Sequence, residues 1–168
     1  MSASGGAEMP GILLLGTFDT KGDEYRYVRE RLRLLGWGTV SVDVGVLGPS
    51  RLRADVPREE VAKAAGVSID DLVRAGDRGA AVAAMAHGAE LVVRRLFKED
   101  RLSGALALGG SSGAALASLA FRPLPFGVPK LIVSTVVAGD TRPFVGDTDL
   151  TLMYPVVDLA GINSLTAQ

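Results

Sequence analysis

Cysteine is absent from this chain, and His87 is its single histidine. The absence of cysteine excludes disulfides, thiolate metal ligands and a cysteine nucleophile. One histidine cannot build a histidine-rich metal site, and we interpret His87 as a packing or interface residue. A cysteine-free composition suits a reducing compartment, so we expect the protein to be cytoplasmic.

Long apolar runs and an excess of one charge are also missing. No apolar run approaches the roughly 20 residues that a membrane-spanning helix needs. The formal net charge is -1, so we expect neither nucleic acid nor a membrane as partner. Residues 1–10 lack the basic and apolar segments of a secretory signal and are expected to be a flexible lead-in to one domain over residues 11–168.

Glycine is plentiful instead, with 21 residues that cluster where apolar or helical runs end. Short apolar runs alternate with segments of helical periodicity, which predicts an α/β fold: a Rossmann-like three-layer sandwich with a mostly parallel sheet. The expected strands are 11–15, 39–44, 102–108, 130–133 and 148–153. The expected helices are 23–35, 57–66, 78–99 and 112–120, with a brief helix and a loop in 67–77 and the start of a helix in 156–164.

Three polar turns, at 16–21, 109–113 and 134–141, each follow an expected strand. The carboxyl ends of parallel strands meet at one edge of a sheet, where open α/β folds bind ligands. We therefore expect amides, hydroxyls, carboxylates and one lysine to share a crevice. That combination suits a phosphate-bearing ligand better than an apolar one.

The glycine-rich turn consists of Gly109, Gly110, Ser111, Ser112 and Gly113 and leads into an alanine-rich helix. Free amides at a helix N-terminus favour an anion, and glycines let a phosphate approach the backbone. The turn is neither a Walker A loop nor a dinucleotide fingerprint. The alternative is a tight turn closed by a serine cap.

The first polar turn begins at Gly16 and offers the hydroxyls of Thr17 and Thr20 and the charge of Lys21. Lysine is a suitable point charge for phosphate. Asp19 is a candidate ligand for a divalent cation. Alternatively, Asp19 or Thr20 caps the following helix and Lys21 is solvated.

Two further candidates lie outside the turns. Asp43 ends the second expected strand, where dinucleotide-binding folds place a ribose-binding acid; the alternative is a solvated carboxylate. Arg78 opens the long helix, an unfavourable place for a cation beside the helix dipole, so we expect something else to hold it, such as a phosphate.

The third polar turn supplies Ser134, Thr135, Gly139 and Asp140, which could grip phosphates or sugar hydroxyls. The nucleophile-elbow pattern G-x-S-x-G is absent, and no histidine lies near these hydroxyls in the sequence. A serine hydrolase is therefore not expected.

With these residues in view, the chain resembles the N-terminal ATP-binding domain family of the plant tobamovirus-resistance protein and its bacterial relatives. The resemblance runs from Leu14 to the end and rests on several motifs in the same order. They are GTFDTKGDE at 16–24, VDV at 42–44, LPFGVPKLIVST at 124–135 and PVVDLAGINS at 155–164.

The resemblance implies a Rossmann-like first subdomain that contributes to an ATP site, with Mg2+ as the accompanying ion, and that forms a homodimer. It also implies a second subdomain in a longer or companion chain. Three residues depart from the family pattern: Ser112 replaces a glycine, Ala114 a threonine and Phe18 a small residue.

The leading interpretation is a nucleotide-binding domain with phosphates over 109–113 and 16–21. One alternative is a homodimeric assembly module whose alanine-rich helix packs on its twin. Another is an enzyme acting on a small phosphorylated or carboxylate metabolite. The residues suggest no paired base and nucleophile, so no reaction is predicted.

Overall fold

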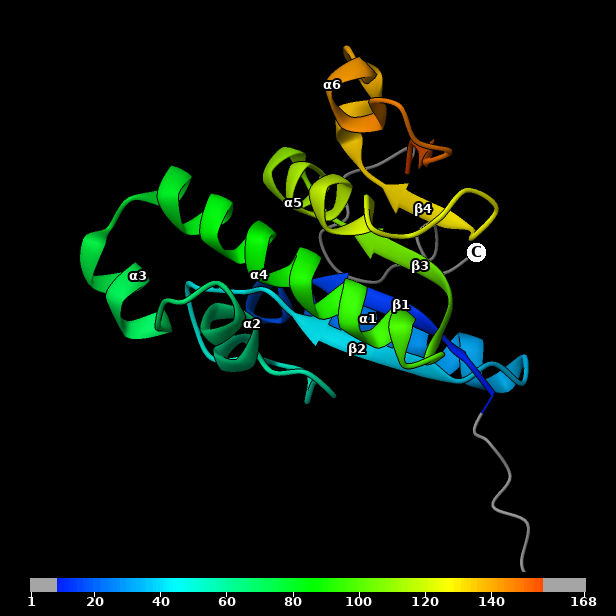
Figure 1. The fold of residues 1–168 in the computed structure, drawn as a ribbon, viewed down its shortest axis with the longest axis horizontal. Coiled ribbons are helices and arrows are strands. Elements are labelled where there is room, and N and C mark those ends of the chain that lie inside the picture. The colour runs from blue at the N-terminus through cyan, green and yellow to red at the C-terminus, as the bar shows by residue number, and fades with distance from the viewer. Residues whose placement is uncertain (1–8, 156–168) are drawn as a thin grey trace, which may run out of the picture.

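A computed structural model describes residues 9–155 of the chain. Five strands form one parallel sheet in the order β2-β1-β3-β4-β5, which confirms the predicted α/β Rossmann-like fold (Figure 1). The strands are β1 (Gly11–Gly16), β2 (Thr39–Asp43), β3 (Leu102–Leu108), β4 (Lys130–Val133) and β5 (Thr151–Met153).

Helices cover both faces of the sheet. Side chains alternate along β1, so that Leu13 and Leu15 enter the larger core with α4, whereas Leu14 packs with Phe18 and Tyr25 of α1 on the other face. The helices are α1 (Phe18–Leu34), α2 (Arg58–Ala64), α3 (Ile69–Ala75), α4 (Arg78–Lys98), α5 (Ser111–Phe121) and α6 (Arg142–Val145), with a 3-10 turn η1 (Thr135–Ala138).

The alanine-rich helix α4 crosses in front of the sheet in Figure 1 and packs against both α2 and α5. Gly88 permits the close approach to α2, because a Cβ atom there would lie 2.1 Å from the Val61 carbonyl oxygen. This packing fixes the start of α4 near the start of α5, at the edge of the sheet where the candidate site lies.

The predicted elements match the structure closely, with three corrections. Strand β5 covers Thr151–Met153, so the strand predicted at 148–153 begins three residues too early. Helix α1 begins at Phe18, whose amide donates to the Asp43 carboxylate, and this first turn precedes the start predicted at residue 23. A kink at Lys21 separates the first turn from the rest of the helix, which continues close to the predicted start. The predicted turn at 134–141 contains η1 and leads into α6, since Ser134 caps η1 through its hydroxyl.

Some expectations lie outside the described residues, among them most of the flexible lead-in and the helix expected at 156–164. Within residues 9–155, every helix is too short or too polar to cross a membrane.

Candidate functional site

The candidate site lies where the strand order of the sheet reverses. The chain passes from β1 to β2 on one side and then returns to β3 on the other, and open α/β folds bind ligands at such a reversal. We use the word crevice for this edge, at the carboxyl ends of β1 and β3. The register pairs Leu15 with Ala107 and Leu108 with Val133, so these strands end side by side. The structure therefore brings the turns at 16–21 and 109–113 to one edge.

The turn between β3 and α5 has an open helix N-terminus. Gly110 is the N-cap, and no side chain caps the helix. The first backbone bond of the helix runs from the Ala114 amide to the Gly110 carbonyl oxygen at 2.9 Å, which leaves the preceding three amides without a helical partner. These amides belong to Ser111, Ser112 and Gly113.

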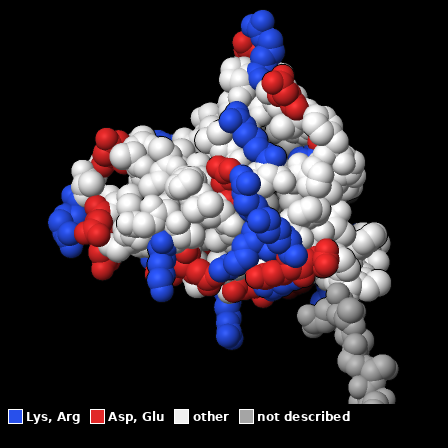
Figure 2. All heavy atoms as spheres, viewed as in Figure 1, with Lys and Arg blue, Asp and Glu red and all other residues white. Residues whose placement is uncertain are grey.

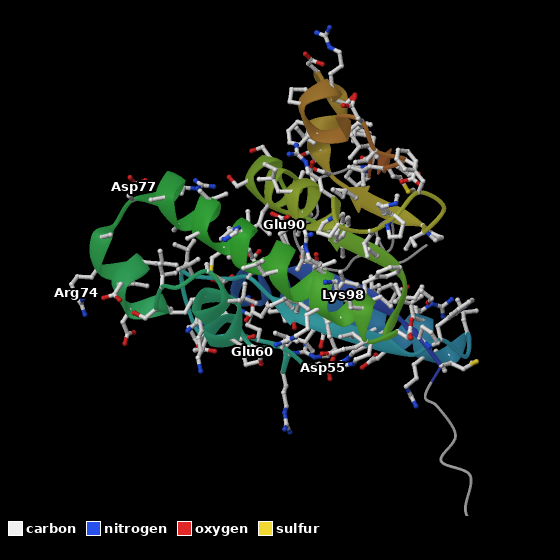
Figure 3. The ribbon with its side chains drawn as sticks, viewed as in Figure 1. Asp55, Glu60, Arg74, Asp77, Glu90 and Lys98 are labelled. Carbon is white, nitrogen blue, oxygen red and sulfur yellow. The ribbon has the colours of Figure 1, made fainter. Side chains whose placement is uncertain are left out.

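Arg78 lies against this open turn. One guanidinium nitrogen donates to the Ser112 hydroxyl at 3.1 Å, and this cation stands at the unfavourable start of α4. Asp77, labelled in Figure 3, caps α4 through the Ala80 amide, but neither α4 nor α5 has an acid in its first turn. The positive ends of two helices and one guanidinium thus meet at the glycine-rich turn, which favours an anion.

The turn between β1 and α1 is instead closed by a carboxylate of the protein itself. Asp43 is 1% exposed, and its Oδ1 accepts hydrogen bonds from the amides of Phe18 at 3.0 Å and Gly45 at 2.9 Å. The Asp43 carboxylate thus stands at the positive end of α1, where an external anion would otherwise bind. Burial raises the pKa of the Asp43 carboxyl above its ordinary value.

Asp19 points away from the helix end and holds the loop after β2. Its Oδ2 accepts from the amides of Leu47 at 2.8 Å and Gly48 at 3.2 Å. Its Oδ1 is buried and has no hydrogen-bond partner within residues 9–155. Gly45 is required there, because a Cβ atom would lie 2.6 Å from Oδ1.

The remaining polar groups of the first turn form a rim. The hydroxyls of Thr17 and Thr20 are 2.8 Å apart, and the Lys21 ammonium lies 3.7 Å from a Glu24 carboxylate oxygen. Lys21 has non-helical backbone angles, so the helix is kinked at this rim. These side chains follow β1, whereas Arg78 begins α4 and contacts the turn that follows β3.

Tyr25 lies beneath the crevice and is a residue that the sequence analysis missed. It is fully buried, and a Cβ atom on Gly16 would lie 2.2 Å from its hydroxyl oxygen. Gly16 therefore makes room for the tyrosine. No local pattern marks this contact, because the two residues meet only when α1 folds back on β1.

The third polar turn is divided between two places. Ser134 is buried, and its hydroxyl accepts from the Val136 amide at 3.3 Å. Thr135 begins η1 and Gly139 directly follows its end, and η1 packs beside α5. Asp140 is exposed and paired with Arg142 at 2.8 Å at the start of α6, which projects from the body of the protein (Figure 1).

A groove of about 740 Å³ lies beside the end of β2, with Asp43 among its lining residues. The residues that line this groove are 43, 49–55 and 57–59.

Within the described part of the chain, no cluster of three or more His, Cys, Asp or Glu side chains could hold a metal ion. On the face that carries α4, acidic and basic side chains are interspersed (Figure 2), as the pairs Arg94–Glu90 and Arg95–Glu60 illustrate.

Comparison with known proteins gives matches over nearly the whole chain. The model of the N-terminal domain of an uncharacterised protein family, UPF0261, matches residues 10–168. A UPF0261 protein of Clostridium tetani is 46% identical over 157 residues, covering 94% of this chain and 39% of the relative. The ToMV resistance protein Tm-1 of tomato, Solanum lycopersicum, is 35% identical over 179 residues, covering 98% of this chain and 24% of the relative. The chain thus spans well under half the length of these relatives.

Proposed function

This chain belongs to the UPF0261 family, and from that starting point we propose that it is a nucleotide-binding domain whose preferred ligand is ATP with Mg2+. The observation that carries the proposal is the uncapped N-terminus of α5 with Arg78 on Ser112. Helix N-termini with free amides are common phosphate sites. The sequence resemblance to an ATP-binding domain family supports ATP as the phosphate-bearing ligand that we propose.

The phosphates would accept hydrogen bonds from the amides of residues 111–113 and the guanidinium of Arg78. Lys21, Thr17 and Thr20 supply charge and hydroxyls from the facing rim. The end of α1 contributes no free amide at Phe18, because Asp43 already occupies it. Mg2+ at such a site would be held mainly by phosphate oxygens and waters, with at most one or two carboxylates from the protein.

The groove beside β2 is the place we propose for the sugar and base. Two strand spacings, about 10 Å, separate the end of β3 from the end of β2, a distance that a polyphosphate can span. Asp43 lines this groove, but its Oδ1 is bonded to backbone amides. We therefore propose that the exposed side chains of Ser50 and Arg51, rather than that of Asp43, contact the ribose.

The compartment and the assembly of the domain are the remaining parts of the proposal. We propose that it acts in the cytoplasm as a homodimer. Because the chain spans 39% of the Clostridium relative, we also propose that a second subdomain, in a longer or companion chain, completes the site. Light scattering tests the dimer, and a monomer at tens of micromolar would contradict it.

Calorimetric titration with ATP, ADP and inorganic phosphate tests the ligand. Gly110→Val is the informative variant, because no atom lies within 4 Å of the added Cβ and loss of the glycine N-cap costs at most about 1 kcal/mol. We expect at least tenfold weaker ATP binding with a nearly unchanged melting temperature. Gly38→Val, at the opposite edge of the sheet with its nearest atom at 3.8 Å, should bind ATP normally.

Two results would overturn the proposal. One is a wild-type protein that neither releases heat with millimolar ATP nor gains thermal stability from it. The other is equal ATP affinity in Gly110→Val and the wild type, which would mean that the ligand does not approach the glycine-rich turn.

A further inference from the structure

The Tyr25 hydroxyl lies between the ends of the two strands that flank the crevice. The β1–β3 ladder ends with the pair Leu15 and Ala107. Directly beyond it, the Leu108 amide donates to the Tyr25 oxygen at 2.6 Å, and the hydroxyl donates to the Leu15 carbonyl. The hydroxyl thus takes the place of a backbone ladder bond where β1 and β3 stop pairing.

The tyrosine ring is held firmly in this position. It packs against the bare Cα of Gly16 and against Phe18, whose ring centroid is 4.9 Å away. Burial raises the pKa of the hydroxyl far above its ordinary value, so Tyr25 stays protonated and able to donate. Because its ring is held by Gly16 and Phe18, the Tyr25 hydroxyl can in turn hold in place the strand ends to which it is hydrogen-bonded.

Leu108 connects this hydroxyl directly to the open turn. It is the last residue of β3, and the next residue, Gly109, donates its amide to the Val133 carbonyl of β4 at 3.1 Å. The start of the turn is therefore fixed by Tyr25 on one side and by β4 on the other. A shift of Leu108 would be passed on to the free amides of 111–113, only three to five residues further along.

We propose that Tyr25 is a positioning residue that sets the separation of the β1 and β3 ends and thereby the orientation of the amides of the glycine-rich turn. Its effect on the turn is independent of any ligand, whereas its effect on affinity rests on the proposed function. A residue that serves only in packing would stabilise the fold without affecting the geometry of the glycine-rich turn in particular, whereas a positioning residue changes both.

Tyr25→Phe is the test, since it removes the hydroxyl and keeps the ring. Ser118→Ala is the matched control, because it also removes one buried hydroxyl that donates to a backbone carbonyl, that of Phe144, but lies further along α5. Both variants should lower the melting temperature. Only Tyr25→Phe should shift the amide resonances of residues 109–113 and weaken ATP binding about tenfold.

The outcomes separate the two claims. If the turn resonances of Tyr25→Phe match those of the wild type, Tyr25 is a packing residue and the inference is wrong. If the wild type binds no ATP, the proposed function fails, while the turn resonances still decide the role of Tyr25. Hydrogen exchange of the wild type gives an independent test. The Leu108 amide should exchange with solvent as slowly as the β1 ladder amides, and fast exchange would overturn the inference.

Discussion

The two turns that flank the crevice are alike in sequence and opposite in state. Each follows a buried parallel strand, contains glycine and hydroxyl residues, and begins a helix. At the start of α1 the Asp43 carboxylate accepts from the backbone amide, whereas no side chain caps the start of α5. The amides at the start of α5 are therefore free to bind an external anion, whereas the Phe18 amide at the start of α1 is already bonded within the protein.

The largest expected difference comes from the same substitution in each turn. Gly16→Ala places a Cβ atom 2.2 Å from the Tyr25 hydroxyl and should cost about 3 kcal/mol of folding free energy. In Gly110→Ala the added Cβ atom has no other atom within 4 Å, so its free energy of unfolding should lie within about 1 kcal/mol of the wild-type value. Urea unfolding of both variants measures the difference, and similar losses would break the distinction between a packed and an open turn.

Removing the internal anion should open the closed turn at a cost to stability. Asp43→Ala leaves the buried amides of Phe18 and Gly45 without an acceptor, with an expected loss of about 2 kcal/mol or more. Asp43→Asn keeps one oxygen for both amides and should retain most of the stability. Chemical denaturation of the two variants checks this order. Equal stability of Asp43→Ala and the wild type would show that Asp43 does not cap α1.

The open turn should respond in binding rather than in stability. Arg78→Ala removes an exposed guanidinium that reaches Ser112, so the melting temperature should change little while ATP affinity falls about tenfold. Arg74→Ala is the control, because Arg74 is also exposed but pairs with Asp71 on α3. ATP titration of both variants distinguishes them. Equal affinity in Arg78→Ala and Arg74→Ala would remove Arg78 from the site.

The smallest expected effect is a pH dependence confined to the closed turn. Because the pKa of Asp43 is raised in the folded state, folded protein binds this proton more tightly than unfolded protein. The stability of the wild type relative to Asp43→Asn should therefore fall as pH rises from 3.8 through the raised pKa, and then level off. Melting curves of the pair across acidic pH measure it, and a rise in relative stability with pH would contradict a raised pKa for Asp43.

The sequence was sufficient where local pattern decides the structure. The strands at 102–108 and 130–133 were predicted to the residue, because each is an apolar run bounded by turn or loop residues. The position of Arg78 at a helix start indicated that another group holds it, and the structure supplies Ser112, 34 residues away.

Contacts between distant segments account for what sequence reasoning missed. The true start of α1 depends on Asp43, 25 residues further along, and the role of Tyr25 depends on Leu108, 83 residues further along. Neither partner is visible from periodicity or turn chemistry. The same reason explains why Asp43 could be placed at a strand end from the sequence while its acceptor role toward Phe18 could not.

The long separation between β1 and β3 also bears on how the chain is made. At the roughly 5–20 residues per second of protein synthesis, the 83 residues between Tyr25 and Leu108 take about 4–17 s to appear. Once β2 has been made and until β3 follows, β1 can pair on one side only, and its other edge is a site for mispairing with other nascent chains. A stalled or truncated product that ends before residue 102 would keep that edge exposed, so such fragments should be bound by chaperones or aggregate, while chains that have completed β3 do not.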